Sequence, residues 1–273
     1  MMARRVLILL GTFIPVVAAL GCRSVGRITG ETVPIDAPGS KEASAPRLSH
    51  VDRAALARTD PKTFLRLCRN DYIGRVHGYR CRLVRQERLS GELRPEQEFD
   101  VVFRESPHSV ELRWVRGPLS TRHVVYVEKA GTHDAKKKAR VELPGVPLHL
   151  HLDIHGSVMK GHARRPLDQF GFRRILEAIE AVCEACRNWP GYHLAFLGEE
   201  TVSHRPCYRF ERRLPVNQAG SSDLAALLRL WIDQEWLVPI RIEEFADSDG
   251  EILLGRYEFL EVVFEMNPTT VLE

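Results

Sequence analysis

The chain has 273 residues, a formal net charge of +3 at pH 7 and 27% charged side chains. A charge balance this close to neutral gives no electrostatic footprint for nucleic acid, and we expect no nucleic-acid partner. The length suits one well-buried domain or two small ones.

The N-terminal end has the layout of an export signal. A basic stretch, Met1–Arg5, is followed by an apolar run, Val6–Gly21, that is short for a membrane-spanning helix. The small or apolar residues Ala19–Gly21 stand directly before Cys22, which is the pattern of a lipoprotein signal. We therefore expect a lipoprotein signal peptide over residues 1–21 and lipidation of Cys22.

Alternatives stay open for this end of the chain. An ordinary signal peptide or an uncleaved anchor would leave Cys22 as an incidental cysteine, and Ala19 stands where such motifs more often have leucine. Arg4 and Arg5 match part of the twin-arginine export consensus. Arg23 stands in place of the aspartate that retains some lipoproteins at the inner membrane, which favours the periplasmic side of the outer membrane as the destination.

Residues 22–50 are predicted to form a flexible tether. The segment is rich in Gly, Pro, Ser and charged residues and has no apolar period. A random coil of about 28 residues reaches roughly 30 Å. Such a tether would let a folded domain, residues 51–273, stand off a membrane surface.

Two helices are predicted. Thr59 or Asp60 can cap the first helix and Pro61 suits its first turn. Apolar side chains then return at helical spacing, at Phe64, Leu65, Cys68 and Tyr72. The second helix is expected from about Pro166, with a single apolar stripe made of Phe172, Ile175, Leu176, Ile179, Val182, Cys183 and Cys186.

The rest of the folded part alternates with a period of two, separated by polar turns. The predicted strands lie near residues 79–83, 99–103, 110–114, 123–129, 148–155, 192–197, 208–212, 228–233, 238–245 and 253–264. Asp247–Gly250 suits the hairpin turn before the last strand. We expect an α+β domain with about nine to eleven antiparallel strands, curled into a half-barrel.

One strand carries a candidate metal site. His149, His151, Asp153 and His155 alternate with leucine and isoleucine, so their side chains share one face of the predicted strand. Two histidines at this spacing can share a zinc ion. The segment approaches the His-x-His-x-Asp-His motif of metallo-hydrolases, but Ile154 separates Asp153 from His155. A solvated polar face is the favoured interpretation and zinc binding the alternative.

No catalytic constellation is visible in the sequence. Cys183 and Cys186 form a Cys-x-x-Cys unit near the end of a helix, on its apolar stripe, which favours core packing or a disulfide to Cys207 over thiol chemistry. The sequence has no nucleophile elbow and no phosphate-binding glycine loop. We expect a protein without catalysis and without a cofactor.

Several segments together resemble a family of bacterial exported proteins related to the LolA/LolB lipoprotein-carrier superfamily. They are GYRCRLVRQER at 78–88, VVFRESPHSVELRW at 101–114, VVYVEK at 124–129, RRPLDQFG at 164–171 and LWIDQEWLVPIRIEEFADSDG at 230–250. The resemblance implies a strongly curved antiparallel half-barrel, with helices on its concave side and a cavity for acyl chains. Soluble carriers of that superfamily lack a lipid anchor, so a lipidated Cys22 is closer to its receptor-type member.

The resemblance leads to a function hypothesis. We expect an envelope lipoprotein that binds an acyl chain, a lipid or a lipoprotein without catalysis, and that contacts the membrane through its anchor. The candidate cavity residues are Phe103, Leu112, Trp114, Tyr126 and Leu150. An envelope scaffold with a packed barrel, whose protein partners are unknown, is the alternative.

Overall fold

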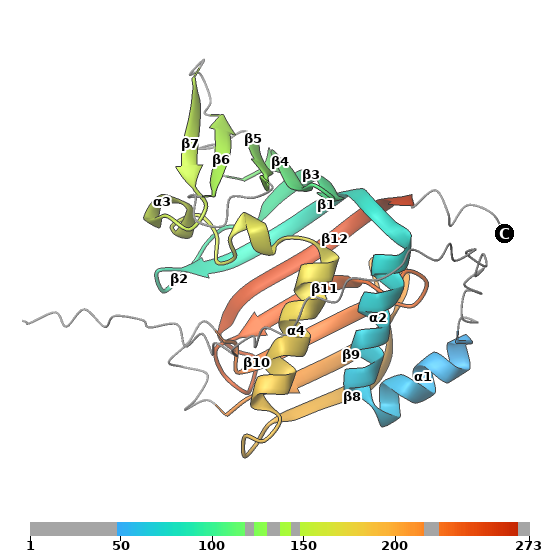
Figure 1. Ribbon diagram of the computed structural model, residues 1–273. Helices are drawn as coiled ribbons and strands as arrows, with labels where there is room; N and C mark the ends of the chain where they lie inside the picture. The colour runs from blue at the N-terminus through green and yellow to red at the C-terminus, as the bar shows by residue number, and fades with distance from the viewer. Residues whose placement is uncertain (1–47, 118–122, 130–136, 143–147, 216–223, 267–273) are drawn as a thin grey trace, which may run out of the picture. The chain divides into compact units, whose positions relative to one another are not determined.

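The computed structural model describes residues 48–117, 123–129, 137–142, 148–215 and 224–266 (Figure 1). The predicted signal peptide, Cys22 and all but the last residues of the predicted tether lie outside this part of the chain. Among the described helices, none has the length and apolar character needed to cross a membrane.

A single antiparallel sheet dominates the fold. Its spatial order is β7-β6-β5-β4-β3-β1-β12-β11-β10-β9-β8, with β2 paired to β1. The strands are β1 (Val76–Leu89), β2 (Glu92–Leu93), β3 (Gln97–Glu105), β4 (His108–Arg116), β5 (His123–Val127), β6 (Lys138–Glu142), β7 (His149–Asp153), β8 (His193–Val202), β9 (Arg205–Arg213), β10 (Leu227–Asp233), β11 (Pro239–Phe245) and β12 (Leu253–Met266). The predicted antiparallel α+β half-barrel is confirmed: the sheet is curved and stays open.

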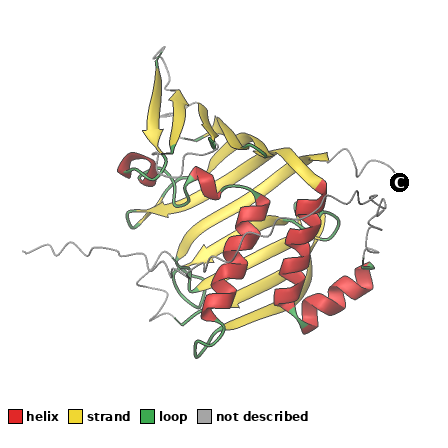
Figure 2. Ribbon diagram, in the orientation of Figure 1, coloured by secondary structure: helices red, strands yellow, loops and turns green. Residues whose placement is uncertain are grey.

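The described part of the chain contains four helices, of which the two long ones lie against the concave face of the sheet. They are α1 (His50–Thr59), α2 (Pro61–Arg75), α3 (Ser157–Lys160) and α4 (Phe172–Cys186), with a 3₁₀ turn, η1 (Leu167–Gln169), before α4. Figures 1 and 2 show α2 and α4 side by side across the strands. Arg69 on α2 pairs with Glu180 on α4 at 3.4 Å, so the two helices are also joined by charge.

The two long helices begin as local chemistry dictates. The Asp60 carboxylate accepts a hydrogen bond of 2.9 Å from the Thr63 backbone N–H, and this confirms the predicted cap of α2. The predicted start of the second helix near Pro166 is wrong, because α4 begins at Phe172. Gly171 precedes α4 with φ of +108°, a conformation that breaks the helical path.

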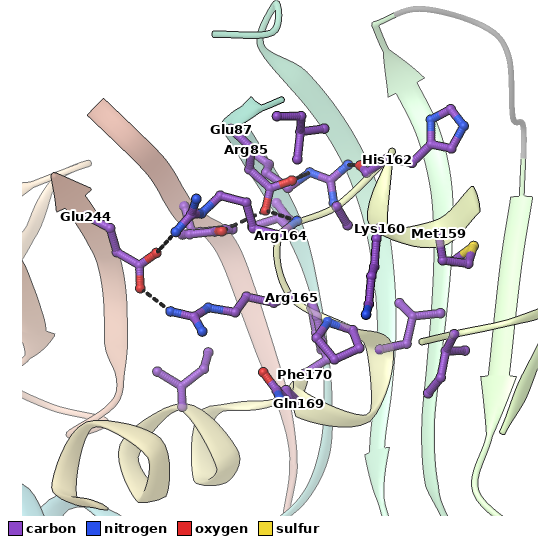
Figure 3. A pocket seen from close by; sticks show the side chains of 18 of the residues that line it. Arg85, Glu87, Met159, Lys160, His162, Arg164, Arg165, Gln169, Phe170 and Glu244 are labelled. Carbon is purple, nitrogen blue, oxygen red and sulfur yellow. Dashed lines mark hydrogen bonds and ion pairs between the residues drawn. The ribbon is translucent and has the colours of Figure 1, made fainter. Parts of the chain in front are cut away.

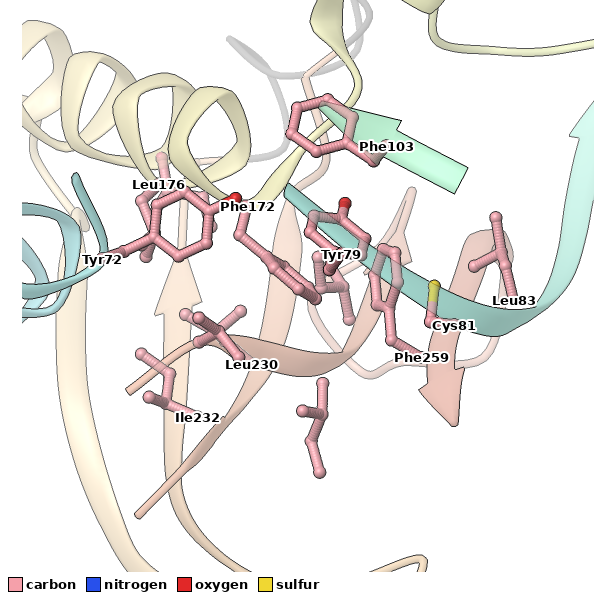
Figure 4. Packing of buried hydrophobic residues seen from close by; sticks show 14 of the residues in the cluster. Tyr72, Tyr79, Cys81, Leu83, Phe103, Phe172, Leu176, Leu230, Ile232 and Phe259 are labelled. Carbon is pink, nitrogen blue, oxygen red and sulfur yellow. The ribbon is translucent and has the colours of Figure 1, made fainter. Parts of the chain in front are cut away.

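An aromatic cluster holds α4 to the centre of the sheet (Figure 4). The Phe172 ring stacks on Tyr79 of β1 at 4.6 Å between ring centroids and meets Phe259 of β12 at 4.9 Å. Tyr79 also stacks on Phe103 of β3 at 4.8 Å. These rings are buried, and aromatic pairs at such distances add stability beyond the area they bury.

Candidate functional site

A cavity of about 900 Å³ lies between the concave face of the sheet, helix α4 and the segment 154–170 (Figure 3). Its walls include residues of β7 near one edge of the sheet and of β9 near the other. The volume falls within the range of about 300 to 1,000 Å³ that is usual for small-molecule sites. The cavity therefore runs across most of the strand order and can hold an elongated molecule.

Strand register builds one wall as a continuous apolar row. Leu112 of β4 pairs with Val124 of β5, Val124 with Val141 of β6, and Val141 with Leu150 of β7. All four line the cavity. Directly opposed residues project from the same face of a sheet, so the row is a consequence of strand alternation and pairing.

Helix α4 supplies the opposite wall with a second stripe. Its fully buried residues, among them Phe172 and Leu176, pack into the core. The adjacent stripe faces the cavity and consists of Arg174, Ile175, Ala178, Ile179 and Val182. One face of the helix thus packs into the core, and the neighbouring face lines the cavity.

The segment between β7 and α4 forms the rim. Val158, Lys160, His162 and Arg165 line the cavity and are exposed to solvent. Figure 3 shows Lys160, His162 and Arg165 around the same space. Because these lining side chains reach solvent, the cavity is accessible along this segment.

Two buried carboxylates tie the rim to the sheet. Glu87 accepts hydrogen bonds from the Tyr257 hydroxyl at 2.6 Å and from the Arg164 backbone N–H at 3.3 Å. Glu244 pairs with Arg165 at 2.7 Å (Figure 3). Burial raises the pKa of Tyr257 far above its ordinary value, so its hydroxyl keeps the donated proton. These contacts hold the rim to the sheet, and none of them involves a residue of the apolar walls.

Cationic side chains outnumber anionic ones around the cavity. The described part of the lining holds seven arginine or lysine residues, namely Arg85, Arg88, Lys160, Arg164, Arg165, Arg174 and Arg212, against two glutamates, Glu87 and Glu244. The whole chain is almost neutral, so this excess is local. A cleft lined by one sign of charge concentrates ligands of the opposite sign.

Arg212 differs from the other cations. It lies on β9, is 4% exposed and lines the cavity. Its Nη2 donates to the Ala225 carbonyl at 3.2 Å, whereas its Nε is buried without a hydrogen-bond partner, and no described carboxylate lies within ion-pairing distance. Arg75, also buried, pairs with Asp71. Burial lowers the pKa of the Arg212 guanidinium, which reflects the cost of removing a charge from water.

The structure divides the predicted cavity residues into two groups. Leu112, Trp114 and Leu150 line the cavity, whereas Phe103 and Tyr126 do not. Phe103 and Tyr126 both flank Val110, in the row of the sheet next to that of Leu112. They are almost completely buried, and the Phe103 ring meets that of Phe170, just after η1, at 6.0 Å.

Sequence reasoning missed several cavity residues. The single apolar stripe predicted for the second helix did not separate the core side from the cavity side, and Ala178 was not singled out. Arg212 had a possible signal, because it is a charged residue at the end of a strand that is otherwise apolar on that face. The rim residues of segment 155–165 carry no periodic signal.

The histidine strand does not gather a metal-binding cluster in the described residues. His149 pairs with Glu142 at 3.6 Å, and His155 pairs with Asp168 at 3.1 Å. Asp153 accepts a hydrogen bond from the His155 backbone N–H, and His151 is exposed. No group of three or more His, Cys, Asp or Glu residues in the described part is placed to hold a metal ion.

The described cysteines are free thiols in the interior. Cys68, Cys81, Cys183, Cys186 and Cys207 are all buried. Burial raises the pKa of Cys183 and Cys186 above the ordinary value, which disfavours the reactive thiolate. Of the two interpretations of the Cys-x-x-Cys unit, the structure shows core packing.

The fold and the cavity together define an α+β half-barrel protein with an accessible apolar cavity on its concave side. The chain belongs to DUF1571, a family described as proteins of unknown function, whose model matches residues 76–271. No curated protein matches this sequence.

Several solved structures are similar to this chain. MucB has 16% identity and a TM-score of 0.45, and the match covers 77% of this chain but 61% of MucB, so this chain spans less than two thirds of that protein. The Mycobacterium tuberculosis lipoprotein LppX has 14% identity and a TM-score of 0.42, with 77% and 97% covered. The LolA-superfamily protein NE2245 from Nitrosomonas europaea has 10% identity and a TM-score of 0.30, with 82% and 96% covered.

Proposed function

We propose that the protein binds an acyl chain, as part of a lipid or a lipoprotein, non-covalently and without catalysis in its concave cavity. The observation that carries the proposal is the cavity itself, about 900 Å³ between the apolar row on β4–β7 and the second stripe of α4. Burial of apolar surface drives such binding, at about 0.8 kcal/mol per methylene group. The alternative of a packed barrel is disfavoured because the sheet encloses open space.

The proposal includes an envelope location. Lipidation of Cys22 would fix the chain to a membrane, and the segment 22–50 would carry the domain into the periplasm. The sequence around Cys22 is what supports this part. Intact mass of protein extracted from membranes of the native host tests it: a chain that starts at Cys22 with added acyl mass is expected, and a soluble chain cleaved elsewhere would refute the anchor.

Trp114 offers a direct test of acyl-chain binding. It is the tryptophan among the described lining residues, and bromine atoms quench indole fluorescence on contact. Delipidated protein is titrated with dibromostearate, and saturable quenching is expected. Trp114→Phe should retain binding of unbrominated stearate by native mass spectrometry and lose most of the quenching.

A matched pair of helix variants tests whether the ligand occupies the cavity. Ala178 and Ala181 are both exposed on α4, but only Ala178 lines the cavity. An indole at position 178 would displace about two methylene groups of the ligand and weaken binding about tenfold. Ala181→Trp should bind like the wild type. Equal affinities for the two variants, or wild-type protein that takes up no fatty acid, would refute the proposed function.

A further inference from the structure

Among the described residues, Arg212 is a buried cation with no carboxylate within ion-pairing distance. We infer that its guanidinium binds the acidic head group of the ligand, so that the cavity selects single-chain amphiphiles carrying a carboxylate or a phosphate. The inference rests on the proposed function and narrows it to one chemical class of ligand. It also gives the bound molecule a direction in the cavity.

The state of Arg212 is the first support. A guanidinium carries five N–H donors, and the structure gives this one a single hydrogen bond, to the Ala225 carbonyl. Ala225 also lines the cavity, so the charged end of the side chain stands at the cavity wall. Burial of an unpaired charge is costly, and an oxyanion beside it would offset that cost through charge-assisted, bidentate hydrogen bonds.

Four of the other lining cations do not offer the same site. Arg164 and Arg165 already pair with Glu244, at 3.8 and 2.7 Å. Arg174 is paired with Glu128 at 2.8 Å, and Lys160 is exposed to solvent. Exposed or compensated charges add little to affinity, whereas they raise the local concentration of an anion. They therefore favour entry of an acidic ligand and leave Arg212 to hold it.

One of the apolar walls lies away from Arg212. Arg212 is on β9, while the apolar row of Leu112, Val124, Val141 and Leu150 belongs to β4–β7, across the central strands of the sheet. A head group at Arg212 would direct the chain toward this row, where Trp114 also lies. The arrangement places a buried cation toward one end of the cavity and an uninterrupted apolar row toward the other.

The main experiment compares ligands that differ in the head group alone. Affinities of delipidated protein for hexadecanoate, hexadecyl phosphate and hexadecanol are measured by competition with a fluorescent fatty-acid probe. We expect at least one of the two anions to bind about tenfold more tightly than the alcohol. In Arg212→Gln this preference should vanish while the affinity for hexadecanol is unchanged, and Arg212→Lys should keep part of it.

Arg213→Gln is the matched control. Arg213 neighbours Arg212 on β9, but it pairs with Glu211 at 2.7 Å and does not line the cavity. Its substitution should leave every affinity unchanged. Ligand-free Arg212→Gln is expected to unfold at a temperature no lower than wild type, because the change removes an unpaired buried charge, and this readout verifies that the variant folds.

The outcomes separate the two proposals. Equal wild-type affinities for the acids and the alcohol would overturn the role of Arg212 while acyl-chain binding stands. An equal loss for all three ligands in Arg212→Gln would also overturn it, since it would reveal a structural role. Absence of binding by every ligand would overturn both proposals. If inorganic phosphate bound as tightly as hexadecyl phosphate, the alkyl chain would add nothing to the affinity. The site would then bind an ion alone, and the inference would be refuted.

The direction of the bound chain gives a second, independent test. Stearate brominated near its methyl end should quench Trp114 more strongly than stearate brominated near the carboxylate, with the signal of Trp114→Phe subtracted. Stronger quenching by bromine near the carboxylate would place the head group at the β4–β7 end and would contradict binding by Arg212.

Discussion

The ring of Phe103 fills the space beside Gly171. A Cβ atom at Gly171 would lie 2.5 Å from Cζ of Phe103, far inside ordinary contact. Gly171 has φ of +108°, and α4 begins at the next residue. Close approach of the backbone to this ring thus sets where α4 starts, and it encloses Phe103 in the core, away from the cavity.

Gly171→Ala is expected to destabilise the fold by about 3 kcal/mol. The cost combines a strained backbone conformation with overpacking against Phe103. Urea unfolding followed by circular dichroism measures it. Gly74→Ala serves as control: the added Cβ meets no atom within 4 Å on helix α2, so a gain of about 0.5 kcal/mol is expected. Similar effects for both variants would contradict the role of Phe103.

Asp233→Ala should cost about 3 kcal/mol of stability. Asp233 is fully buried at the end of β10, where its carboxylate pairs with Arg205 and accepts backbone hydrogen bonds from Glu235 and Trp236, at 2.9 and 2.8 Å. The substitution leaves these donors without their acceptor at the turn into β11. Chemical denaturation provides the measurement. Asp249→Ala, in an exposed hairpin, should change stability by less than about 0.5 kcal/mol.

Glu128 is expected to make stability fall in acid. Hydrogen bonds from Arg174 and Lys137 lower its pKa from 4.5 to about 2. The folded state therefore holds the carboxylate ionised where the unfolded chain binds a proton, so this contribution is complete above about pH 5 and is lost as pH falls toward 2. The unfolding temperature, measured across that pH range, should depend less steeply on pH in Glu128→Gln than in the wild type. Identical slopes for the two proteins would refute the assignment.

The interior cysteines should resist alkylation in the folded protein. Burial raises the pKa of Cys207 to about 12 and that of Cys68 far above its ordinary value, so little thiolate forms near neutral pH. After brief treatment with iodoacetamide, peptide mass spectrometry should find the five described cysteines unmodified, and all of them alkylated in denaturant. Fast modification of Cys183 or Cys186 in the folded state would show that the Cys-x-x-Cys unit is exposed.

Local chemistry made much of the fold predictable. Asp60 and Pro61 mark the start of α2, and the period-two runs mark most of the strands, because each signal depends on neighbours along the chain. The hairpin at 247–250 was predictable for the same reason: the Asp247 carboxylate accepts backbone hydrogen bonds from Asp249, Glu251 and Ile252. Helices α1 and α3 were missed, since α1 has a weak apolar period and α3 is a single turn.

The sequence by itself determined an antiparallel α+β domain and the apolar character of the second helix. Alternation also assigned Leu112 and Trp114 to one face of their strand and Leu150 to the apolar face of another. Tertiary structure decided that Phe103 and Tyr126 lie in the core outside the cavity lining, and that α4 divides its apolar surface between core and cavity. It also decided that Arg212 is buried with no ion-pairing partner among the described residues. Alternation assigns a side chain to a face of its own strand. What covers that face, and which charges meet there, depends on segments distant in the chain.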